Sequence, residues 1–381
     1  MAEEIYLDNA ATTKAFPAVA AAVKDALVNN YANPSSLHQK GLAAEKLIKS
    51  ARRRLAQTLK VGKDEIYYTS GGTEANNLAI QGTLKSLGRA GERIITTEIE
   101  HPSVLNLFKE LEEEWDVKYL SVDQKGQIDL KELQEYLNND TILLSIMAVN
   151  NEIGTIQPLS EVSALINDYQ DLYWHVDGIQ ALGKIDIFPK HLGIDLYSMS
   201  GHKIHGPKGV GALYAAADTN LRSIFKGSQQ EQGLRPGTEN VPGIAGFDKA
   251  VELLASAKER KQLYKLKERL VDKILTQLEG SRLIGPELKE GAPHILNILF
   301  SGLKGEVLVH SLAQDDIYLS TGAACSSQHK TSNHVLEAIG ITEAQLDQTI
   351  RFSLATTNTR AEIDRAANKL VEHSNRLRKM M

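Results

Sequence analysis

The stretch TILLSIMAVN, residues 141–150, says most about the fold. It is an apolar run of strand length, as expected for a strand that is covered on both faces. Around it, short strand-like segments alternate with segments of helical spacing, which indicates a mostly parallel sheet flanked by helices. The strand-like segments are residues 64–70, 92–98, 117–122, 172–178, 194–200 and 209–216, and the helical ones are residues 73–88, 101–114 and 159–170. The sequence therefore predicts an α/β fold.

The pattern changes near residue 244. Residues 244–280 combine charged and apolar side chains at helical spacing, which predicts one long helix or two helices in line. We therefore expect a large domain over residues 15–255 and a smaller α+β domain made of residues 1–14 and 256–381. Strands are expected in the smaller domain at 295–302 and 349–355, and helices at about 305–314 and 360–376.

The composition narrows the class of protein. The 381 residues include 43 basic and 48 acidic side chains, a net charge of −5, which argues against a direct nucleic-acid partner. The N-terminus lacks the apolar segment of a signal peptide, and no run approaches the roughly 18 apolar residues that cross a membrane. The single cysteine cannot form an internal disulfide, which fits a reducing compartment. We expect a cytoplasmic protein without a membrane partner.

A strand, a glycine pair and a helix start follow one another in TSGGTEANN, residues 69–77. Gly71 and Gly72 allow a ligand to approach the backbone closely, and Thr73 suits the cap or first turn of the helix. The free N–H groups of a helix start attract phosphate. On its own, however, the motif favours an ordinary cap and turn, because glycine-rich turns are common.

The segment SMSGHKIHGPKGVGALY, residues 198–214, is more specific. Lys203 lies between a strand end and a turn rich in glycine and proline, where packing explains a lysine poorly. A lysine held among donors can form a Schiff base with an aldehyde cofactor, and Ser200 and His202 could reach the phosphate of such a cofactor. The alternative is a surface lysine in a turn.

Asp177 stands at the carboxyl end of an apolar strand, where a carboxylate is costly unless it is paired. The protonated ring nitrogen of pyridoxal phosphate would provide the partner. One strand–loop–strand step separates Asp177 from Lys203, so both can face one crevice at the carboxyl edge of the sheet. A capping aspartate is the alternative. His101, which precedes a helix, could stack on a pyridine ring and move protons, and Asn151 follows the strand quoted first.

Cys325, the one cysteine, lies among small, loop-forming residues in STGAACSSQHK, residues 320–330. A lone cysteine in an enzyme that has histidines elsewhere is a candidate nucleophile. The alternative is a partly buried thiol with no chemical role.

Taken together in their order, the motifs resemble the cysteine desulfurase family, within the class V group of pyridoxal-phosphate enzymes. The resemblance runs from residue 6 to about residue 355. It is carried by YLDNAATT, NPSSLH, TSGGTEANN, EHPSVLN, NNEIGTIQP, HVDGIQALGK, SGHKIHGPKGVGALY, RPGTEN, STGAACSS and IRFSL. It implies the type I fold of pyridoxal-phosphate transferases, pyridoxal 5′-phosphate as cofactor and no metal ion.

The resemblance also implies a role for each matching residue. Lys203 would carry the cofactor and, with assistance from His101, move the substrate's Cα proton. Cys325 would take the sulfur of L-cysteine as a persulfide, with release of L-alanine. Arg351 would clamp the substrate carboxylate, a task suited to its planar fork. The implied cofactor contacts are Gly72, Thr73, His101, Asn151, Asp177, Gln180, Ser200, His202 and Thr238, and Asn33 would line the substrate side.

Partners follow from the same resemblance. We expect a homodimer in which Thr238 completes the phosphate site of the partner subunit. The sulfur would pass to an acceptor protein, either an iron–sulfur scaffold or an enzyme of tRNA or cofactor thiolation. The stretch from Cys325 to Arg351 is long enough for the mobile loop of the group that serves iron–sulfur assembly. Ala323 and Ala324 depart from the Ser-Ala pair that many members carry before the cysteine.

Two alternatives remain at this point. A selenocysteine lyase, or another class V enzyme such as an aminotransferase, would share most of these motifs, although a plain aminotransferase needs no thiol. A catalytically silent partner protein would keep the fold, but such relatives usually lose the lysine or the nucleophile, and this chain has both.

Overall fold

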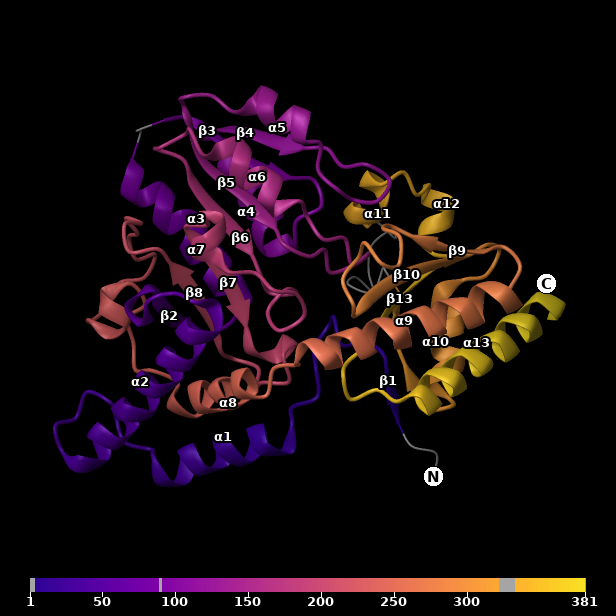
Figure 1. Ribbon diagram of the computed structural model, residues 1–381, viewed down its shortest axis with the longest axis horizontal. Coiled ribbons are helices and arrows are strands. Elements are labelled where there is room, and N and C mark those ends of the chain that lie inside the picture. The colour runs from indigo at the N-terminus through magenta and orange to yellow at the C-terminus, as the bar shows by residue number, and fades with distance from the viewer. Residues whose placement is uncertain (1–3, 89–90, 322–332, 381) are drawn as a thin grey trace.

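The computed structural model describes residues 4–88, 91–321 and 333–380. Its larger sheet has seven strands within these residues, and Figure 1 shows it flanked by helices. In order across the sheet, the strands are β2 (Ile66–Thr69), β8 (Gly211–Ala215), β7 (Leu196–Ser200), β6 (Tyr173–Asp177), β5 (Thr141–Met147), β3 (Arg93–Thr97) and β4 (Asp116–Leu120). The strands β7, β6, β5, β3 and β4 are parallel, and β8 runs antiparallel to both of its neighbours. The expected α/β class with a mostly parallel sheet is confirmed.

Helices cover both faces of this sheet, which explains the apolar run that dominates the sequence. All residues of β5 are buried. One face packs against α3 (Gly72–Leu87) and α4 (Pro102–Leu111). The other face packs against α1 (Pro17–Asn29), α2 (Gln39–Leu59), α5 (Leu130–Tyr136), α6 (Leu159–Ile166) and α8 (Val241–Glu252). A strand between two helix layers meets apolar side chains in both directions, so it needs no polar alternation.

Most elements after α8, together with β1, form a second core around a smaller sheet, to the right in Figure 1. Its strand order is β12 (Ser320–Thr321), β13 (Thr349–Ser353), β10 (Ile295–Phe300) and β9 (Ser281–Ile284). Helices α9 (Ala257–Gln277), α10 (Gly305–Ala313) and α13 (Arg360–Met380) pack on it, and β1 (Ile5–Tyr6) pairs with β11 (Ile317–Tyr318) beside them. The short helices are α7 (Pro189–Leu192), α11 (His334–Ala338) and α12 (Glu343–Leu346). The division into domains at residues 15 and 255 stays a prediction.

Of the two alternatives expected for residues 244–280, the structure has two helices, α8 and α9, with a break between them, and not one long helix. Ser256 caps α9: its hydroxyl accepts from the backbone N–H of Glu259 at 3.3 Å, and the Glu259 carboxylate accepts from the Ser256 N–H at 2.7 Å. This reciprocal capping satisfies free N–H groups and fixes a helix start. Within the described ranges, no helix is both long and apolar enough to cross a bilayer.

Candidate active site

A cavity of about 380 Å³ lies where the carboxyl ends of β5, β6 and β7 approach the smaller sheet. Parallel strands bring their carboxyl ends to one edge, which is where open α/β sheets bind ligands. The sequence-predicted residues that line this cavity are Gly72, Thr73, His101, Asn151, Asp177, Gln180, Ser200, His202, Lys203 and Arg351. The expected crevice therefore forms, while the individual roles of these residues stay predictions.

Lys203 ends the short 3₁₀ turn Gly201–Lys203 that follows β7. Its Nζ donates to the carbonyl oxygen of Ala11 at 2.9 Å and also to that of Ala10. Burial, assisted by the positive charge of Arg351, lowers the pKa of Lys203 to about 8. A lysine with a depressed pKa has a substantial neutral fraction near neutrality, and the neutral amine is the nucleophile.

Asp177 is the last residue of β6 and is 4% exposed. Its carboxylate accepts from Nδ2 of Asn76 at 2.8 Å and from the backbone N–H of Ile179 at 2.9 Å. Burial raises the pKa of Asp177, and the nearby His101 opposes that shift. In the described part of the chain, no ion pair reaches this carboxylate. A cationic ring nitrogen would supply the compensation that a buried carboxylate requires.

His101 is the N-cap of α4, where its Nδ1 accepts from the backbone N–H of Ser103 at 3.1 Å. The Ser103 hydroxyl lies 2.8 Å from the same Nδ1 and accepts from Nδ2 of Asn76 at 2.9 Å. Since Nδ1 accepts the backbone N–H and so carries no proton, the hydroxyl donates to it. Because Nδ1 is an acceptor, the proton of the neutral ring is on Nε2. Burial lowers the pKa of His101. Asn76 thus links Asp177 to the residues that orient His101.

The expected phosphate seat lies at the start of α3, whose first two residues are Gly72 and Thr73. An adjoining cavity of about 530 Å³ contains both of them, together with Ser200 and His202. The buried hydroxyl of Ser200 has no hydrogen-bond partner among the described residues, and a Cβ on Gly72 would lie 2.2 Å from the side chain of Ile179. A bound phosphate would engage the free hydroxyl and the helix N–H groups. These residues therefore fit the phosphate of pyridoxal phosphate.

Gln180 and Asn151 lie on opposite sides of Asp177 along the chain. The Gln180 Nε2 donates to the carbonyl oxygen of Ala10 at 2.9 Å, and its Oε1 lies 3.4 Å from Nε2 of His294. Asn151 Nδ2 donates to the carboxylate of Glu152 at 2.9 Å. Both side chains line the cavity around Lys203, which is compatible with their predicted contacts to the cofactor ring.

Arg351 reaches the cavity from β13 of the smaller sheet and is 7% exposed. It forms ion pairs with Glu152 at 2.6 Å and with Asp8 at 3.1 Å. Burial raises the pKa of the Glu152 carboxyl, and the Arg351 charge opposes that shift. Asp8, Asn76 and Glu152 were not predicted as site residues, although all three lie inside the motifs YLDNAATT, TSGGTEANN and NNEIGTIQP.

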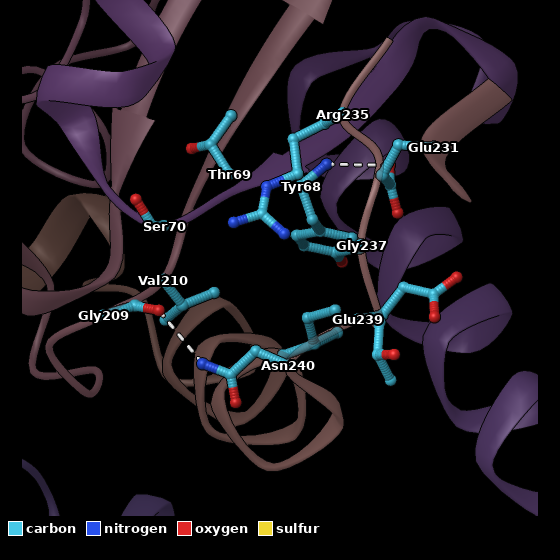
Figure 2. Close-up of a pocket in the computed structure, with 12 residues that line it drawn as sticks. Tyr68, Thr69, Ser70, Gly209, Val210, Glu231, Arg235, Gly237, Glu239 and Asn240 are labelled. Atoms are coloured by element: carbon cyan, nitrogen blue, oxygen red, sulfur yellow. Dashed lines mark hydrogen bonds between the residues drawn. The ribbon is translucent and has the colours of Figure 1, made fainter. Parts of the chain in front are cut away.

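Two of the predicted residues that the structure describes, Thr238 and Asn33, do not line this cavity. Thr238 lines a separate pocket of about 180 Å³, which Figure 2 shows with Arg235, Glu231 and Tyr68 around it. Asn33 is exposed in the loop between α1 and α2, where its Oδ1 accepts from the Ser35 N–H at 2.9 Å. Cys325 lies outside the described residues, as do Ala323 and Ala324. The roles of Thr238, Asn33 and Cys325 stay predictions.

Comparisons with known proteins find relatives over nearly the whole chain. A family model described as Aminotransferase class-V matches residues 5–366. A NifS/IcsS protein homolog of Lactobacillus delbrueckii subsp. bulgaricus is 41% identical, with 98% of each chain covered. A cysteine desulfurase of Nostoc sp. is 42% identical over 98% of this chain and 94% of its own.

Two solved structures share the fold of this chain over nearly its whole length. One named NifS-like protein has a TM-score of 0.90 at 36% identity and covers 97% of this chain and 99% of its own. A structure titled SspA in complex with cysteine has a TM-score of 0.81 at 34% identity and covers 93% of this chain and 100% of its own.

Proposed function

Since the chain belongs to the class-V aminotransferase family, we propose that the cavity around Lys203 is the active site of a cysteine desulfurase that uses pyridoxal phosphate. The protein has the type I fold of pyridoxal-phosphate transferases. One observation carries the assignment: Lys203 and Asp177 line the same cavity. The pKa of Lys203 is about 8, and the buried carboxylate of Asp177 has no ion pair among the described residues.

Each part of the cofactor has a matching group in the cavity. The start of α3 and the Ser200 hydroxyl would hold the phosphate, Asp177 would hold the protonated ring nitrogen, and Lys203 would hold the aldehyde carbon. When bound, pyridoxal phosphate supplies an electron sink that makes the Cα proton of an amino acid acidic.

The side chains divide the remaining work. Arg351 would bind the carboxylate of L-cysteine, and the neutral Lys203 amine would take the Cα proton. The Cys325 thiolate would form a bond to the substrate sulfur as the Cβ–S bond breaks, with its electron pair left on carbon. Protonation of that carbon and the return of a proton to Cα give L-alanine, and Cys325 keeps the sulfur as a persulfide. We propose that this sulfur passes to an iron–sulfur scaffold or a thiolation enzyme in the cytoplasm.

We also propose a homodimer with shared sites. Thr238 does not line the cavity of Lys203 in its own chain, so its predicted phosphate contact requires a second copy. The helices α1 and α2 present an apolar hairpin surface, which we define as Leu27, Val28, Tyr31, Leu37 and Leu42, with exposed fractions of 42–93%. A cluster of this kind is typical of a protein–protein contact.

The assignment is tested by trapping the cofactor and by measuring products. Borohydride reduction of the loaded protein is expected to attach pyridoxal phosphate to Lys203 in peptide mass spectrometry, and the protein is expected to release L-alanine from L-cysteine. Cys325→Ala should keep the cofactor's visible absorbance and lose sulfur transfer. Lys190→Ala, at an exposed position in α7, is the lysine control and should leave the adduct at Lys203 unchanged. An adduct at another residue, or no adduct, would contradict the assignment.

Shared sites predict complementation between two inactive chains. A mixed dimer of Lys203→Ala and Thr238→Ala chains contains one site with both native residues, because one chain supplies the lysine and the other supplies the threonine. Mixing the two variants should restore alanine release above that of either variant alone. Absence of restoration, with mixed dimers present in native mass spectrometry, would show that Thr238 serves no site of the other chain.

A further inference from the structure

His294 is a buried histidine next to the cofactor cavity that no predicted role uses. It immediately precedes β10 and is 1% exposed. Its Nε2 lies 3.4 Å from Oε1 of Gln180, whose Nε2 donates to the carbonyl oxygen of Ala10 at 2.9 Å. A carbonyl oxygen can only accept, so the Ala10 contact fixes which end of the Gln180 amide is nitrogen. His294 therefore faces an oxygen and must donate to it.

The surroundings of His294 keep it in the form that can donate through Nε2 alone. Burial, together with Lys184, Lys267 and Lys203 nearby, lowers the pKa of His294 well below its usual value, so the ring is neutral. A neutral imidazole carries one proton, which the contact with Gln180 assigns to Nε2. Nδ1 has no partner in the described ranges, so Gln180 is the only hydrogen-bond partner of this ring found there.

We propose that His294 is a positioning residue that holds the Gln180 amide so that an N–H group, and not the carbonyl oxygen, is offered to the cofactor ring. The Gln180 Nε2 has two hydrogens, and Ala10 is the only acceptor of either among the described residues. The second hydrogen is left for the cavity that Gln180 lines. If the Gln180 amide were reversed, its carbonyl oxygen would face the hydroxyl oxygen of the cofactor ring. The two oxygens would repel each other when the ring hydroxyl is ionised. This inference rests on the proposed function.

His294 also ties this contact to the smaller sheet. Its carbonyl oxygen accepts from the backbone N–H of Leu354 at 2.8 Å, one residue after β13, the strand that carries Arg351. Asn297 of β10 is the register partner of Arg351. One hydrogen-bonded sheet therefore positions both the predicted substrate clamp and the histidine behind Gln180.

The test measures binding of pyridoxal phosphate to cofactor-free protein by titration of the visible absorption band. His294→Phe keeps an aromatic ring and removes the donor, and we expect its dissociation constant to rise about fivefold, the factor of one ordinary hydrogen bond. His294→Gln keeps a donor, so its dissociation constant should remain within about twofold of that of the native protein. That change is smaller than the one expected for the loss of one hydrogen bond. His373→Phe, a buried histidine on α13 in the second core, is the control and should bind normally.

A double-mutant cycle with Gln180→Leu separates positioning from general packing. If His294 acts through Gln180, adding His294→Phe to Gln180→Leu costs no further affinity. Losses that multiply in the double variant, or a His294→Phe protein that binds like the native one, would overturn the proposal. His294→Leu replaces the phenylalanine variant if circular dichroism shows that the latter is unfolded. A native protein that binds no pyridoxal phosphate would instead refute the proposed function itself.

Discussion

Arg351 lies between two carboxylates, and this arrangement decides how the substrate clamp behaves. Glu152 and Asp8 hold the guanidinium in place, so its orientation is fixed before a substrate arrives. The arginine in turn compensates the buried charge of Glu152. Removing one member of a buried ion pair leaves an uncompensated charge, which costs more than the pair contributes.

We predict that Arg351→Leu destabilises the protein in a pH-dependent way. Without the arginine, the already raised pKa of Glu152 rises further, so the folded state binds a proton that the unfolded state releases. The free energy of unfolding should therefore fall as the pH rises. We expect a loss of about 3 kcal/mol at pH 8 and a smaller one at pH 5.5. Urea unfolding at both pH values measures this, and the double variant with Glu152→Gln should lose the pH dependence.

The depressed pKa of Lys203 leads to a prediction about the rate at which the protein reacts with its cofactor. In cofactor-free protein, the rate of reaction with pyridoxal phosphate should rise with pH with a midpoint at about pH 8, because only the neutral amine reacts. Stopped-flow absorbance measures the rate. Arg351→Leu removes a charge that lowers this pKa, so it should move the midpoint to higher pH. A midpoint near that of an ordinary lysine in the native protein would refute the burial argument.

Residue types in motifs were enough to select Lys203, Asp177 and the start of α3 as candidates, because each stands at or just after a strand end, and all three line one cavity. Their supporting residues were not predictable in the same way. Asp8 and His294 come from segments far away in sequence and contact Arg351 and Gln180, which line the cavity, and these partners are set by the packing of two sheets. The sequence carries no local signal for such contacts.

The break between α8 and α9 leads to a prediction about the stability of the protein. Ser256→Ala removes the cap of α9 and should lower the free energy of unfolding by about 1 kcal/mol. Because α9 packs in the second core and lines neither cavity, alanine release should not change. Ser301→Ala, in the exposed turn after β10, is the matched control in thermal unfolding. Equal stability of the two variants would contradict the role of the cap.

The strands and helices around the apolar run were predictable because their periodicity is local. Direction and pairing were not: nothing in residues 209–216 indicates that β8 is antiparallel to its neighbours. The two-residue strands β1 and β11 are too short for any pattern, and they exist because they pair with each other. The break after α8 was readable from Ser256 and Glu259, which have the spacing of a capping box.

The site depends on the contact between the larger and the smaller sheet, which we call the seam. The loop after β5 carries Asn151 and Glu152 and lies against the start of β10 (Figure 1). The carbonyl oxygen of Gly154 in this loop accepts from the backbone N–H of Ala292 at 2.7 Å. Gly154 has φ of +74°, and a Cβ there would lie 2.8 Å from the carbonyl oxygen of Ile295. Only glycine allows this close approach.

We therefore predict that Gly154→Ala moves Arg351, which lies on the smaller sheet, away from Glu152 and from the cofactor side of the site. Gly302 is the matched control, because its φ is +78° and a Cβ there meets nothing within 4 Å. Gly302→Ala should cost about 1–2 kcal/mol from its backbone conformation alone. Gly154→Ala should cost about 1–3 kcal/mol more, as an overpacked contact does. Its KM for L-cysteine should rise more than its dissociation constant for pyridoxal phosphate, since Arg351 lies beyond the seam and the phosphate seat does not. Equal effects of the two variants in unfolding and in KM would mean that the seam does not position the substrate clamp.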